Sequence, residues 1–118
     1  MVTPELIAER PDDVQALVDA WYLALAFIEE NPEEATEIMA SKADLTPEEY
    51  ATLADGTRIF SAEEALVSFT PGDDVTSLQF VAELINPFLV ESGLTAEEAP
   101  LDGLFDPSFT QAYVDAAG

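Results

Sequence analysis

Residues 10–34, RPDDVQALVDAWYLALAFIEENPEE, decide the fold class of this chain. Apolar residues recur in this stretch at helical spacing, at Val14, Leu17, Val18, Trp21, Leu25 and Ile28. Tyr22, Leu23 and Phe27 widen the stripe until it nearly surrounds the helix, which predicts a central, buried helix. The longest apolar run, residues 20–28, is well short of the ~20 residues that cross a bilayer.

The stretch ends on a helix-start pattern that recurs along the chain. It occurs as Asn31-Pro32-Glu33-Glu34, Thr46-Pro47-Glu48-Glu49, Ser61-Ala62-Glu63-Glu64 and Thr95-Ala96-Glu97-Glu98. Its first residue can accept a bond from a free backbone N–H, and the Glu three residues later can bond back, as in a capping box. Asp106-Pro107 is a further expected cap. The pattern predicts a string of helices.

The fold class follows from these starts and from the apolar spacing between them. We expect helices over residues 11–30, 32–41, 47–54, 62–69, 77–92 and 107–116. Ala35, Ile38 and Met39 are expected to face inward. Gly56 and Gly93 suit the ends of two helices, and Pro87 is expected to bend one. The fold is therefore predicted to be mainly α, with six to seven helices and little strand, as a single helical unit over residues 1–118. The best candidate for a short extended piece is the segment 57–60.

The composition excludes several classes of function. The 118 residues include 25 acidic and 3 basic residues and no His or Cys, for a net charge of -22. Such a surface repels phosphate backbones and anionic membranes, so no nucleic acid is expected as a partner. Without Cys or His the chain has no disulfide, no thiolate nucleophile and none of the usual zinc ligands. The 48% hydrophobic residues nevertheless predict a folded chain.

The charge imbalance also bears on stability. With only Arg10, Lys42 and Arg58 as cations, few ion pairs can form, and self-repulsion should weaken the fold at low ionic strength. Added salt is expected to stabilise it. The composition suits a protein from a salty environment or an acidic extracytoplasmic protein from an ordinary habitat.

Carboxylate pairs are the candidates for chemistry that the residues offer. Glu29-Glu30, Glu33-Glu34 and Glu63-Glu64 could hold Ca²⁺ or act as acid and base. Neighbouring helical residues point about 100° apart, however, and most of these pairs have a capping role. Asp73-Asp74 lacks the alternating spacing of a Ca²⁺ loop. We therefore expect no catalytic residue, no metal site beyond weak adventitious binding, no cofactor and no enzymatic activity.

Aromatic and serine residues are also read as structural. Trp21, Tyr22 and Phe27 could form a ligand box, but their apolar helix favours core packing. The same prediction applies to Phe60, Phe69, Phe80, Phe88, Phe105 and Phe109. The serines Ser61, Ser68, Ser77 and Ser108 have no His to activate them.

Two stretches resemble a known family. The first is VTPELIAERPDDVQALVDAW at residues 2–21, followed by Ala24, Phe27 and the segment 31–35. The second runs from Phe80-Val81 through Asn86-Pro87-Phe88 and Gly93-Leu94 to the ending at residues 104–109, LFDPSF. In this pattern the chain resembles the C-terminal third of the extracytoplasmic solute-binding proteins of ABC importers, in the nitrate, sulfonate and taurine group that also includes thiamine-precursor binders.

The resemblance implies a part of a two-lobed α/β protein that closes on a small molecule and delivers it to a membrane permease. It also implies a strand that ends near Thr3-Pro4-Glu5 and a periplasmic or extracytoplasmic location, although no signal peptide is expected on this chain. No ligand-binding residue is assigned by it. The alternative is a stand-alone acidic helical interaction module, or a small subunit of a larger assembly, in which a protein partner or a second copy covers apolar helix faces.

Overall fold

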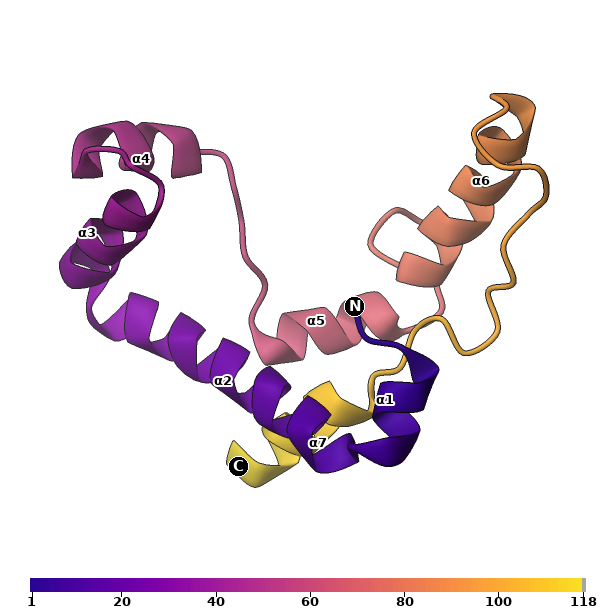
Figure 1. Ribbon diagram of the computed structural model, residues 1–118, viewed down its shortest axis with the longest axis horizontal. Helices are drawn as coiled ribbons and strands as arrows, with labels where there is room; N and C mark the ends of the chain where they lie inside the picture. Colours follow the sequence, from indigo (N-terminus) through magenta and orange to yellow (C-terminus); the bar gives the residue numbers. More distant parts are fainter. Residues whose placement is uncertain (118) are drawn as a thin grey trace. The chain divides into compact units, whose positions relative to one another are not determined.

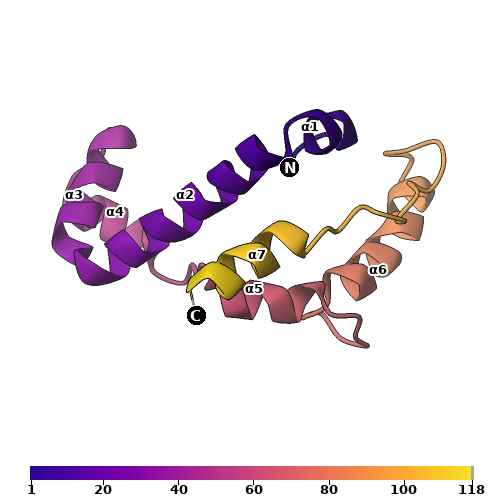
Figure 2. The same ribbon diagram turned by 90° about the horizontal axis from the view of Figure 1, so that it is seen from below.

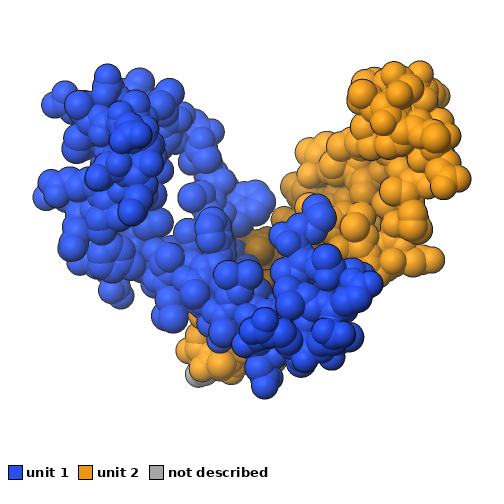
Figure 3. All heavy atoms as spheres, in the orientation of Figure 1, with its two compact units in different colours: residues 1–61 blue, residues 62–118 orange. Residues whose placement is uncertain are grey.

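The computed structural model describes residues 1–117, and over these residues it consists of seven α-helices and no strand. The predicted mainly α fold is therefore confirmed. In order, the helices are α1 Pro4–Glu9, α2 Pro11–Glu30, α3 Pro32–Lys42, α4 Pro47–Ala54, α5 Ala62–Phe69, α6 Leu78–Glu91 and α7 Ser108–Ala117 (Figure 1). The sequence predicts one helical unit. The contacts gather in two compact units, residues 1–61 and 62–118, which Figure 3 colours separately. Each unit is described by itself.

The first unit is a row of helices in which each packs against the next along the chain. α1 contacts α2, α2 contacts α3, and α3 contacts α4 (Figure 1). Between the last two, the Tyr50 hydroxyl donates to the Met39 sulfur over 3.3 Å. The helices α2, α3 and α4 begin at Pro11, Pro32 and Pro47, as the sequence predicts.

The predicted capping box at Thr46 is confirmed, whereas the one at Asn31 is wrong. The Glu49 N–H donates to the Thr46 hydroxyl at 3.3 Å, and the Thr46 N–H donates to the Glu49 carboxylate at 2.9 Å. The Asn31 side chain instead donates backward to the Phe27 carbonyl at 3.2 Å. Asn31 stands between two helices, and its amide closes the end of α2 rather than the start of α3.

Neither stretch expected to be extended forms a strand. The resemblance implies a strand that ends near Thr3-Pro4-Glu5, but Thr3 caps the short helix α1 by accepting the Leu6 N–H at 3.3 Å. Thr-Pro-Glu is the same helix-start pattern that opens α4, which explains why a helix forms there. Residues 57–60 form no strand either.

The second unit is built around α5. This helix packs against α7 and also contacts α6; Figure 2 shows α5 and α7 side by side. Ser77 is buried and caps α6 by accepting the Phe80 N–H at 3.4 Å. α6 ends at Glu91, and Gly93 follows its C-cap as predicted: the φ of +70° at Gly93 lets the Leu94 N–H reach the Leu89 carbonyl at 2.9 Å. Pro87 lies inside this helix, as predicted.

The helix start predicted at Thr95-Ala96-Glu97-Glu98 is wrong, because no helix forms there. The Asn86 side chain donates to the Ala99 carbonyl at 2.8 Å and accepts the Ala99 N–H at 2.9 Å. Both backbone groups of Ala99 are thus bonded to α6 instead of to a local helical turn. Pro100 follows immediately and disfavours a helical conformation at the residue before it.

The core is small, and several residues predicted to be buried are exposed. The buried hydrophobic residues among those described are Val14, Tyr22, Ala35, Ala40 and Ala62. Ala35 therefore faces inward as predicted, but Ile38 is 48% exposed. The prediction of core packing is also wrong for several aromatic residues, since the exposed residues include Trp21, Phe27, Phe60 and Phe88. Helices that pack in successive pairs bury only part of each apolar surface, which accounts for the difference.

Candidate functional site

One side of α2 is apolar and open. We call Leu17, Ala20, Trp21, Leu23, Ala24 and Phe27 the α2 face. All six are exposed; the exposed fraction is 63% for Leu17, 53% for Trp21 and 62% for Leu23. Tyr22 lies on the other side of the same helix and is buried, and Val14, one turn before Leu17, is buried at the end of the stripe that α1 adjoins. Helices that are apolar all round are normally buried on every side, so this face has the character of a contact surface without its contact.

The spacing along the α2 face suits another helix. Residues 17, 20, 21 and 24 stand at i, i+3, i+4 and i+7, and residues 20, 23, 24 and 27 repeat that spacing. Four residues in this arrangement form a hole that receives one side chain of a facing helix. Ala20 and Ala24 are shared by both holes and make their floors shallow, while Leu17, Trp21 and Phe27 form the walls.

An acidic surface adjoins the α2 face, and we call its residues Glu30, Glu33 and Glu34 the acidic corner. Glu30 lies one turn beyond Phe27, and a hollow of about 370 Å³ follows, lined by Glu30, Asn31, Pro32, Glu33 and Glu34. The negative end of α2 and the positive end of α3 meet there, so the two helix dipoles largely offset each other. The three carboxylates therefore set the charge of this corner.

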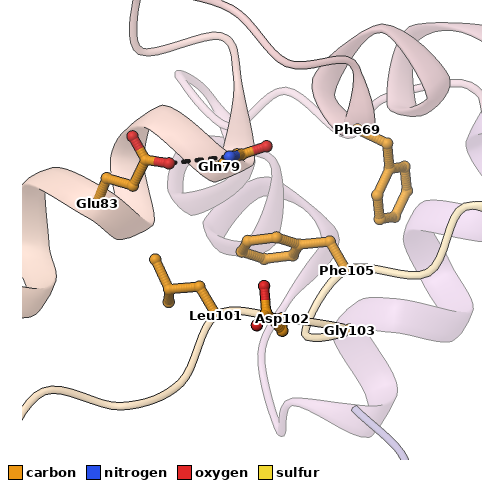
Figure 4. Close-up of a pocket in the computed structure, with 7 residues that line it drawn as sticks. All are labelled: Phe69, Gln79, Glu83, Leu101, Asp102, Gly103 and Phe105. Atoms are coloured by element: carbon orange, nitrogen blue, oxygen red, sulfur yellow. Dashed lines mark hydrogen bonds between the residues drawn. The ribbon is translucent and has the colours of Figure 1, made fainter.

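The second unit carries a separate hollow of about 320 Å³. It is lined by Phe69, Gln79, Glu83, Leu101, Asp102, Gly103 and Phe105 (Figure 4). The Gln79 amide donates to the Glu83 carboxylate at 2.9 Å. Residues 62–118 contain no Lys or Arg, so this hollow offers carboxylates and aromatic rings to a ligand but no cation. Its chemistry disfavours an oxyanion such as nitrate or a sulfonate.

The carboxylate pairs singled out by the sequence do not converge on a common point. Among residues 1–117, no three acidic side chains lie close enough together to hold a metal ion. Asp74 is engaged in a turn, because its carboxylate accepts the Thr76 N–H at 2.8 Å and the Thr76 hydroxyl at 2.5 Å. Over the same residues no helix is both long and apolar enough to span a bilayer.

The carboxyl groups of Glu49, Asp74 and Asp106 have perturbed acidity, and each of the three belongs to a turn or a cap. The Thr46 backbone N–H, and then its hydroxyl, lower the pKa of Glu49. The Thr76 hydroxyl and backbone lower the pKa of Asp74, and Ser108 lowers the pKa of Asp106 in the same way. Hydrogen bonds that favour the charged form explain all three directions. None of these residues lines either hollow, so the shifts mark structural roles rather than reactive groups.

The sequence prediction missed the α2 face because it assigned that side of the helix to the core. A signal was present: between Val14 and Ile28 only Asp19 is charged, so that the helix has two apolar sides rather than one. Comparison with protein-family models, with curated proteins and with solved structures finds no match to the chain.

Proposed function

We propose that this chain is a non-catalytic, acidic helical module that acts by binding another protein through the α2 face. The observation that carries the proposal is the exposure of Leu17, Trp21 and Leu23, each more than half open to solvent on a helix with almost no polar side. Burying apolar area stabilises a complex by about 25 cal/mol per Å², so covering such a face favours association. Tryptophan is among the residues enriched in binding hot spots, and Trp21 stands within this face.

The residues available for chemistry support a binding role over a catalytic one. The sequence has no His or Cys, and its carboxylates are spread over helix starts, turns and the solvent side of helices. A nucleophile needs an adjacent base, and a general acid–base pair needs two groups of separated acidity at one substrate. The lowered pKa values of Glu49, Asp74 and Asp106 belong to a cap and two turns, which supports association over catalysis.

Site-specific crosslinking tests this function. A photoreactive amino acid at position 17 should join the chain to a second protein in its source cells and give an adduct of defined mass. The same amino acid at position 37, an exposed Glu on α3, serves as the control and should give no such adduct. Equal labelling from both positions, or no adduct from position 17, would overturn the proposal.

A second candidate follows from the sequence resemblance, which covers most of the chain. In this proposal the chain is the C-terminal segment of an ABC-importer solute-binding protein, located outside the cytoplasmic membrane and partnered by a permease. The acidic hollow of the second unit suits an amine-bearing ligand, such as a thiamine precursor, better than nitrate, taurine or another sulfonate. The native mass in source cells separates the two candidates, because this one requires a chain several-fold heavier than 12.7 kDa.

A further inference from the structure

The α2 face and the acidic corner that follows it together specify the chemistry of a partner. We propose that this surface binds an amphipathic helix of another protein whose apolar stripe is bordered by Lys or Arg residues. The inference rests on the proposed interaction function and names the class of partner.

A helix fits the surface better than a strand or a loop. Leu17, Ala20, Trp21 and Ala24 form one hole, and the next begins one turn later and ends at Phe27. Two side chains three or four residues apart on a facing helix would fill both holes. The two alanines allow a close approach of the helix axes, because they add little bulk between the larger residues.

The acidic corner, which adjoins the end of the α2 face, favours a partner with positively charged side chains. Phe27 is followed one turn later by Glu30, and Glu33 and Glu34 border the same hollow. A Lys or Arg placed beside the partner's apolar stripe can lay its aliphatic stem along Phe27 and its charged head among these carboxylates. A partner with Asp or Glu at that position would meet like charges instead.

A second copy of this chain is a poor occupant of the same surface. Each copy carries a net charge of -22, and its three basic residues, Arg10, Lys42 and Arg58, lie outside the α2 face. Arg10 is moreover already paired with Asp13. Self-association would bring acidic corners toward one another without added cations, so charge complementarity favours a basic partner.

Trp21 makes the proposal measurable, because it is the single tryptophan of the chain and stands on the α2 face. The probes are three synthetic helical peptides without aromatic residues that share one apolar Leu/Ala stripe. Their flanking positions are Arg, Gln or Glu. Titrated into the full chain, the Arg peptide should shift the Trp21 emission to shorter wavelength and protect Trp21 from acrylamide.

The charge dependence distinguishes recognition from nonspecific hydrophobic contact. The Arg peptide should bind roughly 10-fold or more tightly than the Gln peptide, and the Glu peptide should not bind measurably. Its affinity should fall as NaCl rises from about 0.05 M to about 0.5 M, because salt screens the flanking charges. Equal binding of the three peptides would overturn the proposal, as would an Arg peptide that leaves Trp21 unchanged.

Variants of the chain test whether the Arg peptide binds at the α2 face and the acidic corner. Leu17→Ala should weaken the affinity for the Arg peptide by roughly 10-fold, whereas Leu53→Ala, which changes a similarly exposed leucine on α4, should not. The double variant Glu30→Gln with Glu34→Gln should weaken it more than the double variant Glu48→Gln with Asp55→Asn, which changes the net charge equally. Circular dichroism confirms that each variant is folded. Loss of binding in both members of either pair would contradict the assignment.

The failure of this inference is distinguishable from the failure of the proposed function. If position 17 crosslinks to a protein in cells but the Arg peptide has no advantage, the interaction function stands and the basic partner is wrong. If the free chain already shields Trp21 from acrylamide, or dimerises with a shift in Trp21 emission, the α2 face is occupied and the basic-partner proposal is overturned.

Discussion

The side chain of Asn86 and the backbone of Ala99 are joined by two hydrogen bonds. The Asn86 amide donates to the Ala99 carbonyl at 2.8 Å, and the Ala99 N–H donates back to the Asn86 side-chain oxygen at 2.9 Å. Asn86 is only 7% exposed, so the pair satisfies a polar group that α6 buries. It fixes the segment after α6 against that helix and takes the place of the helix that Thr95-Ala96-Glu97-Glu98 would otherwise start.

Replacing Asn86 should therefore destabilise the second unit and free the segment around Ala99. We expect Asn86→Ala to lower the free energy of unfolding by about 1–2 kcal/mol, because both hydrogen bonds are lost. Hydrogen exchange at the Ala99 amide should accelerate in this variant. In Asn86→Asp the acceptor remains, so that the Ala99 amide should keep more of its protection. Unchanged exchange at Ala99 in both variants would show that the pair does not hold the segment.

The fate of the helix-start patterns shows which part of the fold the sequence could predict. Thr46-Pro47-Glu48-Glu49 forms its capping box because all the bonds involved are local. Thr95-Ala96-Glu97-Glu98 has the same local preference, but the distant Asn86 takes the backbone groups of Ala99. Asn31 caps the helix before it rather than the one after it. Local patterns therefore predicted where helices begin wherever no distant residue competed.

The candidate site could be predicted less well than the helices. Periodicity placed Leu17, Trp21 and Phe27 on a helix correctly, but it cannot tell which apolar side another helix will cover. In the first unit, α2 packs against α1 and α3, and the side with Tyr22 is buried while the side with Leu17 is open. Exposure depends on these pairings between elements, and the spacing of apolar residues does not encode them.

Asp44 occupies a position that favours glycine. Its φ is +56°, and the Leu45 N–H reaches the Ala40 carbonyl at 2.9 Å, as in the turn that Gly93 makes after α6. Asp44→Gly should raise the free energy of unfolding by about 1 kcal/mol, because it relieves the left-handed backbone and removes a carboxylate from the negative end of α3. Asp44→Asn isolates the charge contribution. The reciprocal change, Gly93→Asp, should lower the free energy of unfolding. Urea denaturation measures the free energy of unfolding of all three variants.

The capping box at α4 predicts a pH dependence. Bonds from the Thr46 backbone N–H and hydroxyl lower the folded-state pKa of Glu49, so its charged form is favoured by folding. That stabilisation is present above the unfolded-state pKa, near the ordinary value of 4.5, and is lost as the pH falls through the lowered folded-state pKa. Glu49→Ala should thus be less stable than the wild type at pH 7, and the difference should narrow below about pH 4.

Comparing variant with wild type at each pH removes the self-repulsion that both chains share. Glu48→Ala is the matched control, since Glu48 lies in the same first turn but outside the capping box. Its difference from the wild type should vary less with pH. A Glu49→Ala difference that stays constant from pH 7 to pH 3 would contradict the capping interpretation; thermal unfolding followed by circular dichroism measures it.

The net charge predicts that salt stabilises the fold. With a charge of -22, shortening the screening length from ~30 Å at 0.01 M to ~8 Å at 0.15 M salt reduces self-repulsion. We expect the Tm to rise by at least about 4 °C, which corresponds to roughly 1 kcal/mol for a domain of this size. The rise should disappear near pH 4, because the pI is about 4.1 and little net charge remains there. A Tm that does not change with NaCl at pH 7 would contradict the prediction.

Two residues one turn apart on α2, one buried and one exposed, give the sharpest test of how open the α2 face is. Val14 is 4% exposed, and Val14→Ala should lower the free energy of unfolding by about 1–2 kcal/mol because a buried side chain is truncated. Leu17 is 63% exposed, and Leu17→Ala should change the free energy of unfolding by less than about 0.5 kcal/mol, although this substitution removes more carbon atoms than Val14→Ala. Denaturation of both variants in the free chain measures the contrast. If Leu17→Ala destabilises the chain as much as Val14→Ala does, the α2 face is already covered in the free chain, and the proposal that it binds a partner is contradicted. If Leu17→Ala has the smaller effect, the Leu17 side chain makes no stabilising contact in the free chain and is available to a partner.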